Sequence, residues 1–344
     1  MRNTKANSFV DLNSEDAFAA YSLPGSREHF LIRGNITTEP KTGGFVIQEF
    51  DKHSKAPYYI EPDEFLQNAE FKFTGLLPFN GQVTSKEEYL ESVQDTIAEI
   101  KEGSFRKVVM SRTKKVLQSD QDLHNLFIRL KNKYPQAFVF LYHLPGSGCW
   151  AGASPEILWD ENEKEAITMA LAGTQADAGI PLEMVKWGAK EVDEQQIIEY
   201  FIEEVLQKQE VGYHKVGPYT SKAGSVVHIR SDFKMDNVED SFRIAQLLHP
   251  GPAISGLPVH LAIQWIKEKE GHDRKHYCGF VGPWNLNKRR SLYINLRSME
   301  VFSNACLLYL GGGITAESEA ESEWNETELK ASTMLSVIQQ YSNS

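Results

Sequence analysis

The chain has 344 residues, enough for a sizeable buried core, and its 41% hydrophobic and 24% charged residues are ordinary for a globular protein. Its 36 basic against 47 acidic residues leave a formal net charge of −11, which argues against a broad basic face for nucleic acid and means that an anionic ligand would need a local Arg, Lys or metal ion. No run of 18 apolar residues could span a membrane, the first ten residues lack an apolar signal core, and Cys149, Cys278 and Cys306 form no CxxC pair, so we expect a cytoplasmic protein.

The first 83 residues mix short strand-like runs, at 45–47 and 58–60, with turns rich in Gly, Pro and Lys. Their polarity predicts a peripheral layer or rim. The pattern then sharpens, because Ser85 and the charged residues after it are typical of a helix cap with acids in the first turn. Apolar residues follow at helical spacing as far as Gly103.

The remaining elements are read from periodicity and from turn residues. Strands are expected at 105–117, 137–143, 148–153, 166–170, 225–230, 277–281, 291–297 and 305–310. Helices are expected at 121–133, 181–208, 238–247, 257–270 and 322–340. Runs of strands and runs of helices cluster rather than alternate, which favours an α+β fold with antiparallel sheets over a doubly wound parallel sheet.

The strand at 105–117 carries a lysine between apolar neighbours. Alternation places Phe105, Lys107 and Val109 on one face. Loss of solvation there would lower the pKa of Lys107, and a base that works near neutral pH needs a fall of about 3 units from roughly 10.4. The alternative is a strand-edge lysine whose ammonium group reaches water, and the segment by itself favours that alternative.

Two segments rich in small residues follow. In GASPEILW, residues 152–159, a strand ends and Glu156 comes just after a turn. From there an enclosed carboxyl could stay protonated as a general acid, or a turn glutamate could simply cap a backbone N–H. In ALAGT, residues 170–174, a small-residue turn with the Thr174 hydroxyl would let a ligand approach the backbone, or would only link a strand to a loop.

Acidic residues on two expected helices are candidates for a metal site. Glu194 lies near the apolar stripe of the helix at 181–208, where a carboxylate is unusual unless paired or metal-bound. A triple glycine at 311–313 follows a strand and precedes a helix on which Glu323, Glu326 and Lys330 share a face. Two acids near a helix start suit Mg²⁺, although ordinary charge placement at a helix N-terminus explains them equally.

Two further segments carry candidate polar groups. The loop at 248–258 is shaped by Pro and Gly, and its His249 could be a base or ligand, or could fix the loop by hydrogen bonds. Arg297 lies on the strand expected at 291–297, where its guanidinium could hold a carboxylate through two hydrogen bonds.

Taken in order, these segments resemble one family. They are similar to motifs of the chorismate-binding enzymes, with most likeness to isochorismate synthases. The similar segments are FRKVVMSR, GASPEILW, LAGT, KEVDEQQII, LHPGPAISGLP, DRKHYCGFVGPWN, LRSMEV and GGGIT…SEWNETELKASTM. The resemblance implies an α+β fold of the anthranilate synthase component I type, with two packed antiparallel β-sheets, outer helices and the site in a cleft between the sheets. It implies one large domain, 1–344, with a chorismate-binding catalytic region at 84–340 and a peripheral part at 1–83.

The resemblance also implies catalytic and metal-binding residues. Lys107 stands where members that use water carry a base lysine, and Glu156 matches the general acid. Glu194 and Glu326 match two Mg²⁺ carboxylates, and Glu323 matches an acid that reaches the metal through water.

Residues near the substrate follow from the same comparison. Arg297 and Lys330 match positive groups near the substrate carboxylates, and Gly311 matches a backbone donor beside them. Thr174 and Ala253 match residues that line the substrate pocket.

Four positions qualify the resemblance. Ala172 stands where aminodeoxychorismate synthases have a nucleophilic lysine, which argues against that chemistry. Gln195 replaces a usual histidine, Gly251 replaces a usual threonine, and 311–313 are all glycine where alanine often stands in the middle. These departures affect the shape of the pocket rather than the metal carboxylates or the base.

The implied activity is isochorismate synthase, an isomerase of the hydroxymutase type that needs Mg²⁺. It converts chorismate to isochorismate by adding water at C2 and losing the C4 hydroxyl, for menaquinone or siderophore biosynthesis. A salicylate synthase, which also eliminates pyruvate, and a catalytically inactive chorismate-binding module are the alternatives. We expect no nucleic-acid, membrane or glutaminase partner, and a monomer.

Overall fold

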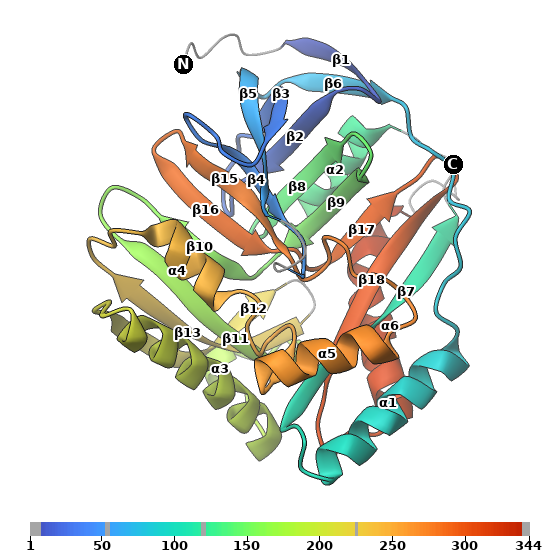
Figure 1. Ribbon diagram of the computed structural model, residues 1–344, viewed down its shortest axis with the longest axis vertical. Coiled ribbons are helices and arrows are strands. Elements are labelled where there is room, and N and C mark those ends of the chain that lie inside the picture. The colour runs from blue at the N-terminus through green and yellow to red at the C-terminus, as the bar shows by residue number, and fades with distance from the viewer. Residues whose placement is uncertain (1–7, 52–55, 118–121, 224–225, 339–344) are drawn as a thin grey trace.

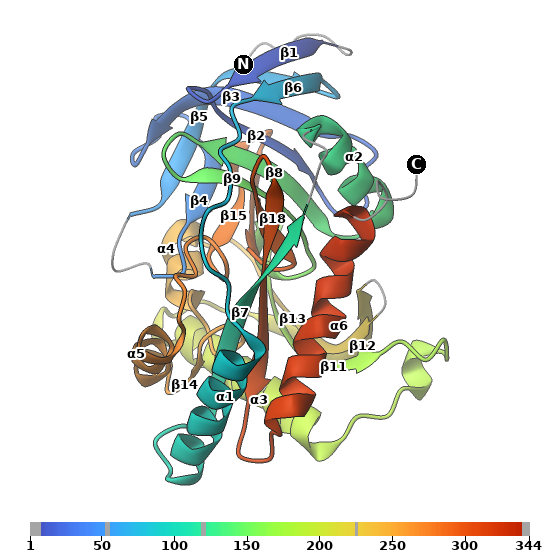
Figure 2. The same ribbon diagram turned by 90° about the vertical axis from the view of Figure 1, so that its right-hand side faces the viewer.

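The computed structural model describes residues 8–51, 56–117, 122–223 and 226–338, and helices surround an extensive sheet in it (Figures 1 and 2). The strands are β1 (Phe9–Asn13), β2 (Ala17–Ser22), β3 (Phe30–Thr37), β4 (Gly44–Gln48), β5 (Tyr58–Gln67), β6 (Glu70–Thr74), β7 (Lys107–Leu117), β8 (Phe138–Leu144), β9 (Gly148–Ser154), β10 (Ile157–Glu161), β11 (Ala166–Ala176), β12 (His214–Ala223), β13 (Val226–Met235), β14 (Gly256–Leu257), β15 (Phe280–Leu286), β16 (Arg289–Ile294), β17 (Ser298–Val301) and β18 (Ala305–Ile314). The helices are α1 (Lys86–Lys101), α2 (Leu123–Lys133), α3 (Ala189–Lys208), α4 (Ser241–Leu248), α5 (Val259–Lys269) and α6 (Ala320–Ile338), with a 3₁₀ turn η1 (Leu182–Met184).

Sixteen of the described strands form one continuous sheet, ordered β12-β13-β11-β10-β16-β15-β4-β5-β3-β2-β8-β9-β17-β18-β7-β14. Its strand pairings are antiparallel, whereas β1 and β6 form a separate parallel pair. The sheet folds back on itself, because Phe138 of β8 and Tyr293 of β16 stack at 4.1 Å between ring centres although five strands separate β8 from β16. Two antiparallel layers therefore pack face to face, which confirms the expected α+β fold.

The N-terminal strands differ from the expected peripheral layer. Every residue of β2 and of β4 is buried, and both strands lie in the middle of the sheet order. Their runs AFAAY and GFVI are too short for periodicity to identify strands that are covered on both faces. The first 83 residues therefore include strands of the central core.

Capping residues and turn residues in the sequence predict where α1 begins, but the expected bounds of other helices differ from those in the structure. Ser85 and Glu88 form a capping box at α1, with N–H···O distances of 3.1 and 2.7 Å, as the charged residues after Ser85 suggested. The helix expected from residue 181 begins only at Ala189, after η1, because Gly188 takes the N-cap position. The last two residues of the helix expected at 322–340 and the first of that expected at 121–133 lie outside the described residues.

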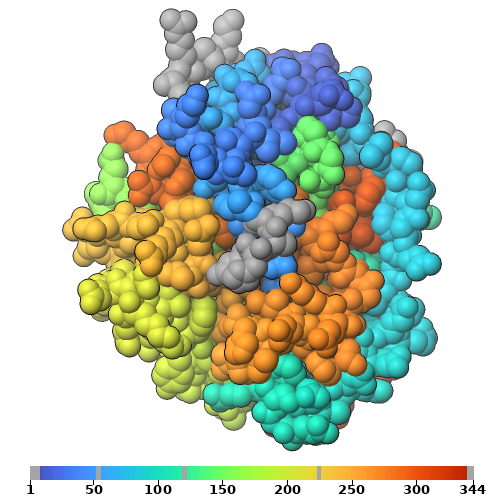
Figure 3. Space-filling view, in the orientation of Figure 1, coloured from blue at the N-terminus to red at the C-terminus, as the bar shows by residue number. Residues whose placement is uncertain are grey.

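The helices cover the outside of the sheet (Figures 1 and 2). Helix α3 packs on β11, α6 on β18, α5 on β7 and β14, and α1 against both β7 and α6. Figure 3 shows segments from the N-terminal third, the α3–α4 region and the α5 region meeting on one face. No helix in the described ranges is long and apolar enough to cross a membrane.

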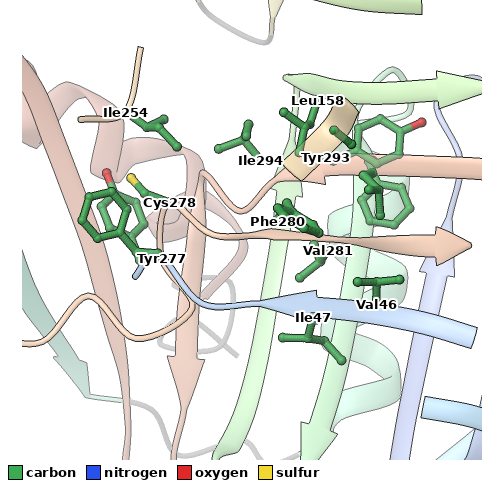
Figure 4. Close-up of a cluster of buried hydrophobic side chains, with 14 of the residues drawn as sticks. Val46, Ile47, Leu158, Ile254, Tyr277, Cys278, Phe280, Val281, Tyr293 and Ile294 are labelled. Atoms are coloured by element: carbon green, nitrogen blue, oxygen red, sulfur yellow. The ribbon is translucent and has the colours of Figure 1, made fainter. Parts of the chain in front are cut away.

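A cluster of buried hydrophobic side chains joins several strands of the sheet (Figure 4). Val46 and Phe280 lie on the neighbouring strands β4 and β15, in the largest cluster of buried apolar residues. The same cluster includes Ile254, Tyr277 and Cys278, which line a cavity. The catalytic candidates described next therefore rest on a rigid apolar base.

Candidate functional site

A cavity of about 160 Å³ brings most of the expected site residues together. Its walls come from β7, β11, α3, β18 and α6, and from the connections around residues 155–156, 253–254 and 296–297. Nine of the ten expected residues line it: Lys107, Glu156, Thr174, Glu194, Ala253, Arg297, Gly311, Glu326 and Lys330. The tenth, Glu323, lies behind Gly312 in the wall.

Lys107 is held at the start of β7 with only 3% of its surface exposed, so it is not a strand-edge lysine that reaches bulk water. Val109 lines the cavity beside it, as the alternation along the strand predicts. The ammonium group of Lys107 donates a hydrogen bond to Glu194 of α3. Space for the lysine comes from Gly313 of β18, since a Cβ there would lie 2.7 Å from Lys107 Cε.

Glu194 points from α3 into the cavity and is ion-paired, as its place on an apolar stripe required. Burial by itself would raise the pKa of Glu194, but the positive charges of Lys107, Lys330 and Lys190 lower it below its usual value. The carboxylate is therefore negatively charged at neutral pH and available to a cation.

Glu156 lies in the two-residue break between β9 and β10; the sequence predicted the end of the strand, but the structure has no turn at 155–156. Burial raises the pKa of Glu156 to about 7, against the opposing positive charge of Lys107. A small adjoining cavity of about 30 Å³, lined mainly by apolar groups such as Ile198 and Phe201, also borders this residue. The carboxyl can thus hold a proton near neutral pH, as a general acid must.

The acidic and basic residues of α6 share the face that packs on β18, as their spacing predicted. Lys330 donates to the Gly311 carbonyl at 2.9 Å and pairs with Glu326 at 2.6 Å. Burial tends to raise the pKa of Glu326, but Lys330 lowers it overall. Glu323 is 4% exposed, and burial together with the negative charge of Glu326 raises its pKa. One of its oxygens accepts from Ser318 at 2.6 Å.

Two backbone features differ from the expected turns. The three glycines at 311–313 lie inside β18 and pair with Ser111, Met110 and Val109 of β7, so they are not a turn after a strand. The ALAGT segment lies within β11, and the register there shifts between Ala172 and Gln175. That β-bulge, with Gly173 at a φ of +64°, brings Thr174 to the cavity wall.

Arg297 lies in the connection between β16 and β17 rather than on a strand, and its φ of +49° is uncommon for a residue with a side chain. Within the described ranges its guanidinium donates to the Lys330 carbonyl and the Thr333 hydroxyl, at 3.4 and 3.5 Å. Among the described residues it forms no ion pair with a carboxylate. It is therefore available to a ligand carboxylate.

His228 of β13 lines the cavity, although no expectation included it. Burial and the charge of Arg297 lower the pKa of His228 to about 4, so the ring is neutral at pH 7. Its Nδ1 lies 2.9 Å from the Gly173 carbonyl, which can only accept, so Nδ1 carries the proton. The buried Nε2 is then an acceptor with no hydrogen-bond partner in the described structure.

Three further cavity residues also escaped the expectations: Lys190 on α3, and Tyr277 and Tyr309 from distant segments. Lys190 lies one turn before Glu194 and 3.8 Å from Glu323. Its position in the KEVDE run was the only available signal, and there it is indistinguishable from a solvated helix face. The rings of the two tyrosines stack at 5.6 Å, and neither was singled out, although Tyr277 lies in the family-like segment DRKHYCGFVGPWN.

The unusual positions Gln195 and Gly251 have structural consequences. Gln195 is buried, and its amide donates to the Ala170 carbonyl at 3.2 Å, which ties α3 to β11. A Cβ at Gly251 would lie 3.2 Å from the Phe201 ring, so glycine leaves room beside the small apolar cavity. His249 hydrogen-bonds the Cys278 carbonyl through Nε2 at 2.9 Å, which supports its role in fixing the loop.

The carboxylates of the cavity and its wall are suitable donors for Mg²⁺. Among the described residues no three His, Cys, Asp or Glu groups converge as a ready-made metal cage. Mg²⁺ nevertheless needs only one or two protein carboxylates, because it keeps several waters. Glu194 and Glu326 line one cavity, and the second oxygen of Glu323 is buried without a hydrogen-bond partner within the described structure. This oxygen-rich, negatively charged group fits the ion.

Comparison with known proteins agrees with the geometry. The model of one sequence family, described as chorismate binding enzyme, matches residues 48–339, so the likeness reaches into the N-terminal part as well. The salicylate biosynthesis isochorismate synthase of Pseudomonas aeruginosa is 30% identical over 251 residues, which cover 70% of this chain and 52% of that protein. The isochorismate synthase EntC of Escherichia coli is 30% identical over 242 residues, covering 67% and 62%.

The matched regions span about half to three fifths of the length of these two relatives. Among solved structures, the menaquinone-specific isochorismate synthase MenF of Escherichia coli superposes with a TM-score of 0.81 at 20% identity, covering 94% of this chain and 89% of that one. The structural likeness establishes the fold.

Proposed function

The chain belongs to the chorismate-binding enzyme family, and on that premise we propose that it is an isochorismate synthase, which converts chorismate to isochorismate. Relatives named as isochorismate synthases, at about 30% identity, support this choice within the family. We propose menaquinone or siderophore biosynthesis as the destination of the product.

The observation that carries the proposal is a paired acid and base in one cavity. Lys107 and Glu156 come from different strands and both line it. The raised pKa of Glu156, about 7, suits a proton donor. A hydroxyl that moves from one ring carbon to another needs a base for the incoming water and an acid for the leaving oxygen, and these residues can supply both.

In the proposed reaction, Lys107 in its neutral form accepts a proton from a water that attacks C2 of the ring. The ring double bond shifts, and Glu156 protonates the C4 hydroxyl so that it departs as water. One water is added and one is lost, so the reaction requires no redox partner. Lys107 must give up one ammonium proton before it can act as a base, and the neutral amine can still donate to Glu194 while its lone pair accepts from the water.

The substrate is a dicarboxylate, and the cavity offers matching cations. Arg297 and Lys330 line it, and Arg297 is available for a carboxylate. The neutral His228 adds an acceptor for a hydroxyl group. We propose that Glu194 and Glu326 hold Mg²⁺, with Glu323 acting through water. When bound, the ion would supply a Lewis-acidic anchor for one substrate carboxylate.

Two residues favour water over ammonia as the nucleophile. A base lysine at position 107 can deprotonate water, which is a weak nucleophile without a base, whereas neutral ammonia is nucleophilic enough to need no such help. Ala172 offers no nucleophile where the resemblance places a lysine in aminodeoxychorismate synthases. The side chain of Ala172 is a methyl group at the cavity wall, so it can only pack against the ring.

The test is to incubate the purified chain with chorismate, Mg²⁺ and ammonium, and to identify the products by chromatography. We expect isochorismate, its loss in excess chelator, and no turnover by Glu156→Gln. Salicylate and pyruvate that appear in step with chorismate loss would instead identify a salicylate synthase. Unchanged chorismate that still binds the protein would identify an inactive binding module.

A further inference from the structure

Two buried polar side chains, Tyr89 and Glu323, lie behind the proposed metal carboxylates, where α1 and α6 run side by side against the β7–β18 pair (Figure 2). Tyr89 of α1 is 1% exposed, and its ring packs on Trp324 at 5.8 Å between centres. Its hydroxyl has no hydrogen-bond partner in the described part of the chain. Buried hydroxyl groups in native proteins are rarely unpaired, so this group points to a small occupant.

Glu323 of α6 presents a second such atom. Ser318 holds its Oε1 at 2.6 Å, which fixes the orientation of the carboxylate. Its Oε2 is buried and, within the described residues, receives no hydrogen bond. A carboxylate oxygen that is removed from water without a donor is costly, so it too needs an occupant.

Both unpaired oxygens face the same spot, the missing side chain of Gly312. A Cβ built there would lie 3.1 Å from Glu323 Oε2, 3.9 Å from Tyr89 Oη and 3.8 Å from Glu326 Oε1. Tyr89 Oη and Glu323 Oε2 are therefore at most about 7 Å apart. One water with two ordinary hydrogen bonds of about 2.8 Å joins oxygens up to about 5.6 Å apart, a separation that lies within this upper bound.

We propose that Tyr89, Gly312 and Glu323 form a binding site for one structural water, and that Tyr89 is through it a positioning residue for the carboxylates that hold Mg²⁺. The water accepts the Tyr89 hydroxyl proton in a hydrogen bond and donates to Glu323 Oε2 and Glu326 Oε1. Burial and the charge of Glu323 raise the pKa of Tyr89 above its usual value, so the phenol keeps its proton and remains a donor. Gly312 is required because a methyl group would enter the space of the water.

This inference rests on the proposed function in so far as Glu323 and Glu326 belong to the Mg²⁺ site. Hydrogen bonds to ligating carboxylates orient them, and loss of such a partner typically weakens metal affinity 10–100-fold. We therefore expect Tyr89 to affect metal binding although it lies on another helix and does not reach the cavity.

The experiment measures Mg²⁺ and Mn²⁺ affinity of the full chain by isothermal titration calorimetry, without substrate. Tyr89→Phe and Gly312→Ala are expected to weaken binding at least about tenfold. The control Tyr21→Phe, a buried tyrosine among the N-terminal strands, should leave binding unchanged. In a Glu323→Gln background, Tyr89→Phe should have little further effect, because the two residues act through one water.

The thermal midpoint of unfolding gives a second readout. The change in midpoint on Tyr89→Phe separates a hydroxyl bound to water from a hydroxyl that has no partner. A hydroxyl with no partner at all destabilises the fold, so its removal in Tyr89→Phe would raise the midpoint. A hydroxyl bound to water would leave the midpoint unchanged or lower it. A raised midpoint, or wild-type metal affinity in both folded variants, overturns the water site while the proposed function stands. A wild-type chain that binds neither metal overturns the Mg²⁺ site and this inference together.

Discussion

Replacing Glu156 by glutamine should remove catalysis and, at the same time, stabilise the fold at alkaline pH. Burial raises the pKa of Glu156 from 4.5 to about 7, so the folded state pays for ionising this group while the unfolded state does not. A folded-state pKa above the unfolded one contributes stability that is full below pH 4.5 and is lost as pH rises through about 7. Glutamine keeps the shape of the side chain and removes this loss.

The magnitude follows from the two pKa values. Between pH 5.5 and 8.5 the wild type loses about 2 kcal/mol through this group, and solvent in the cavity would reduce that to about 1–2 kcal/mol. For a chain of this length such a difference shifts the thermal midpoint by about 1.5–3 °C. The thermal midpoint of Glu156→Gln minus that of the wild type should therefore be about 1.5–3 °C larger at pH 8.5 than at pH 5.5.

The assay is differential scanning fluorimetry of both proteins at the two pH values, with Glu91→Gln on the exposed face of α1 as the control. The control should show the same small difference at both pH values. If the Glu156→Gln advantage does not grow between pH 5.5 and 8.5, or if it reverses, then Glu156 is not a buried carboxyl with a raised pKa and its assignment as proton donor fails.

Four further predictions concern the site and its support. Because Glu156 must carry a proton to donate it, kcat/KM for chorismate should fall as pH rises through about 7; initial rates that keep rising to pH 9 would contradict this. Lys107→Ala should lower kcat at least about 100-fold while calorimetry still detects chorismate binding, and turnover within tenfold of wild type would exclude a base role. Gly313→Ala should lower kcat by displacing Lys107, whereas Gly212→Ala, with open space around it, should be neutral in the same assay. Arg274 forms a buried ion pair with Glu270. Arg274→Met leaves the Glu270 carboxylate uncompensated and should cost about 3–5 kcal/mol of unfolding free energy in a denaturant titration, so a cost below about 1 kcal/mol would show that the pair is not essential to the fold.

Most secondary structure near the site was predictable because its signals are local. The capping box at Ser85, the apolar alternation around Lys107 and the strand break before Glu156 each depend on neighbours in sequence. The partner of Lys107 was not predictable in this way, because Glu194 lies 87 residues away on another element. His228 was missed for the same reason, since its role depends on a bulge that only strand pairing creates.

The glycine run shows how tertiary packing overrides a local signal. Three successive glycines predict a turn, yet residues 311–313 continue a strand because β7 supplies a ladder along the whole of β18. Side chains from three other places use the space that their missing Cβ atoms leave. The Tyr277 hydroxyl lies 2.9 Å from where a Cβ of residue 311 would be. Glu323 uses the space at 312, and Lys107 uses the space at 313. No pattern within the run carries that information.

Two carboxyl groups in one cavity have pKa values shifted in opposite directions, and Lys107 affects both. The lysine lowers the pKa of Glu194 below its usual value, whereas burial outweighs the same charge at Glu156 and raises its pKa to about 7. Environment rather than residue type thus separates the proposed metal ligand Glu194 from the proposed proton donor Glu156. Lys107→Ala would raise the pKa of both Glu194 and Glu156, so it would alter the metal affinity of Glu194 while it extends the pH range over which Glu156 is protonated. A loss of activity in that variant therefore reports a missing base only where metal affinity, measured separately, is unchanged; a loss that excess Mg²⁺ restores would assign Lys107 to the electrostatics of Glu194 instead.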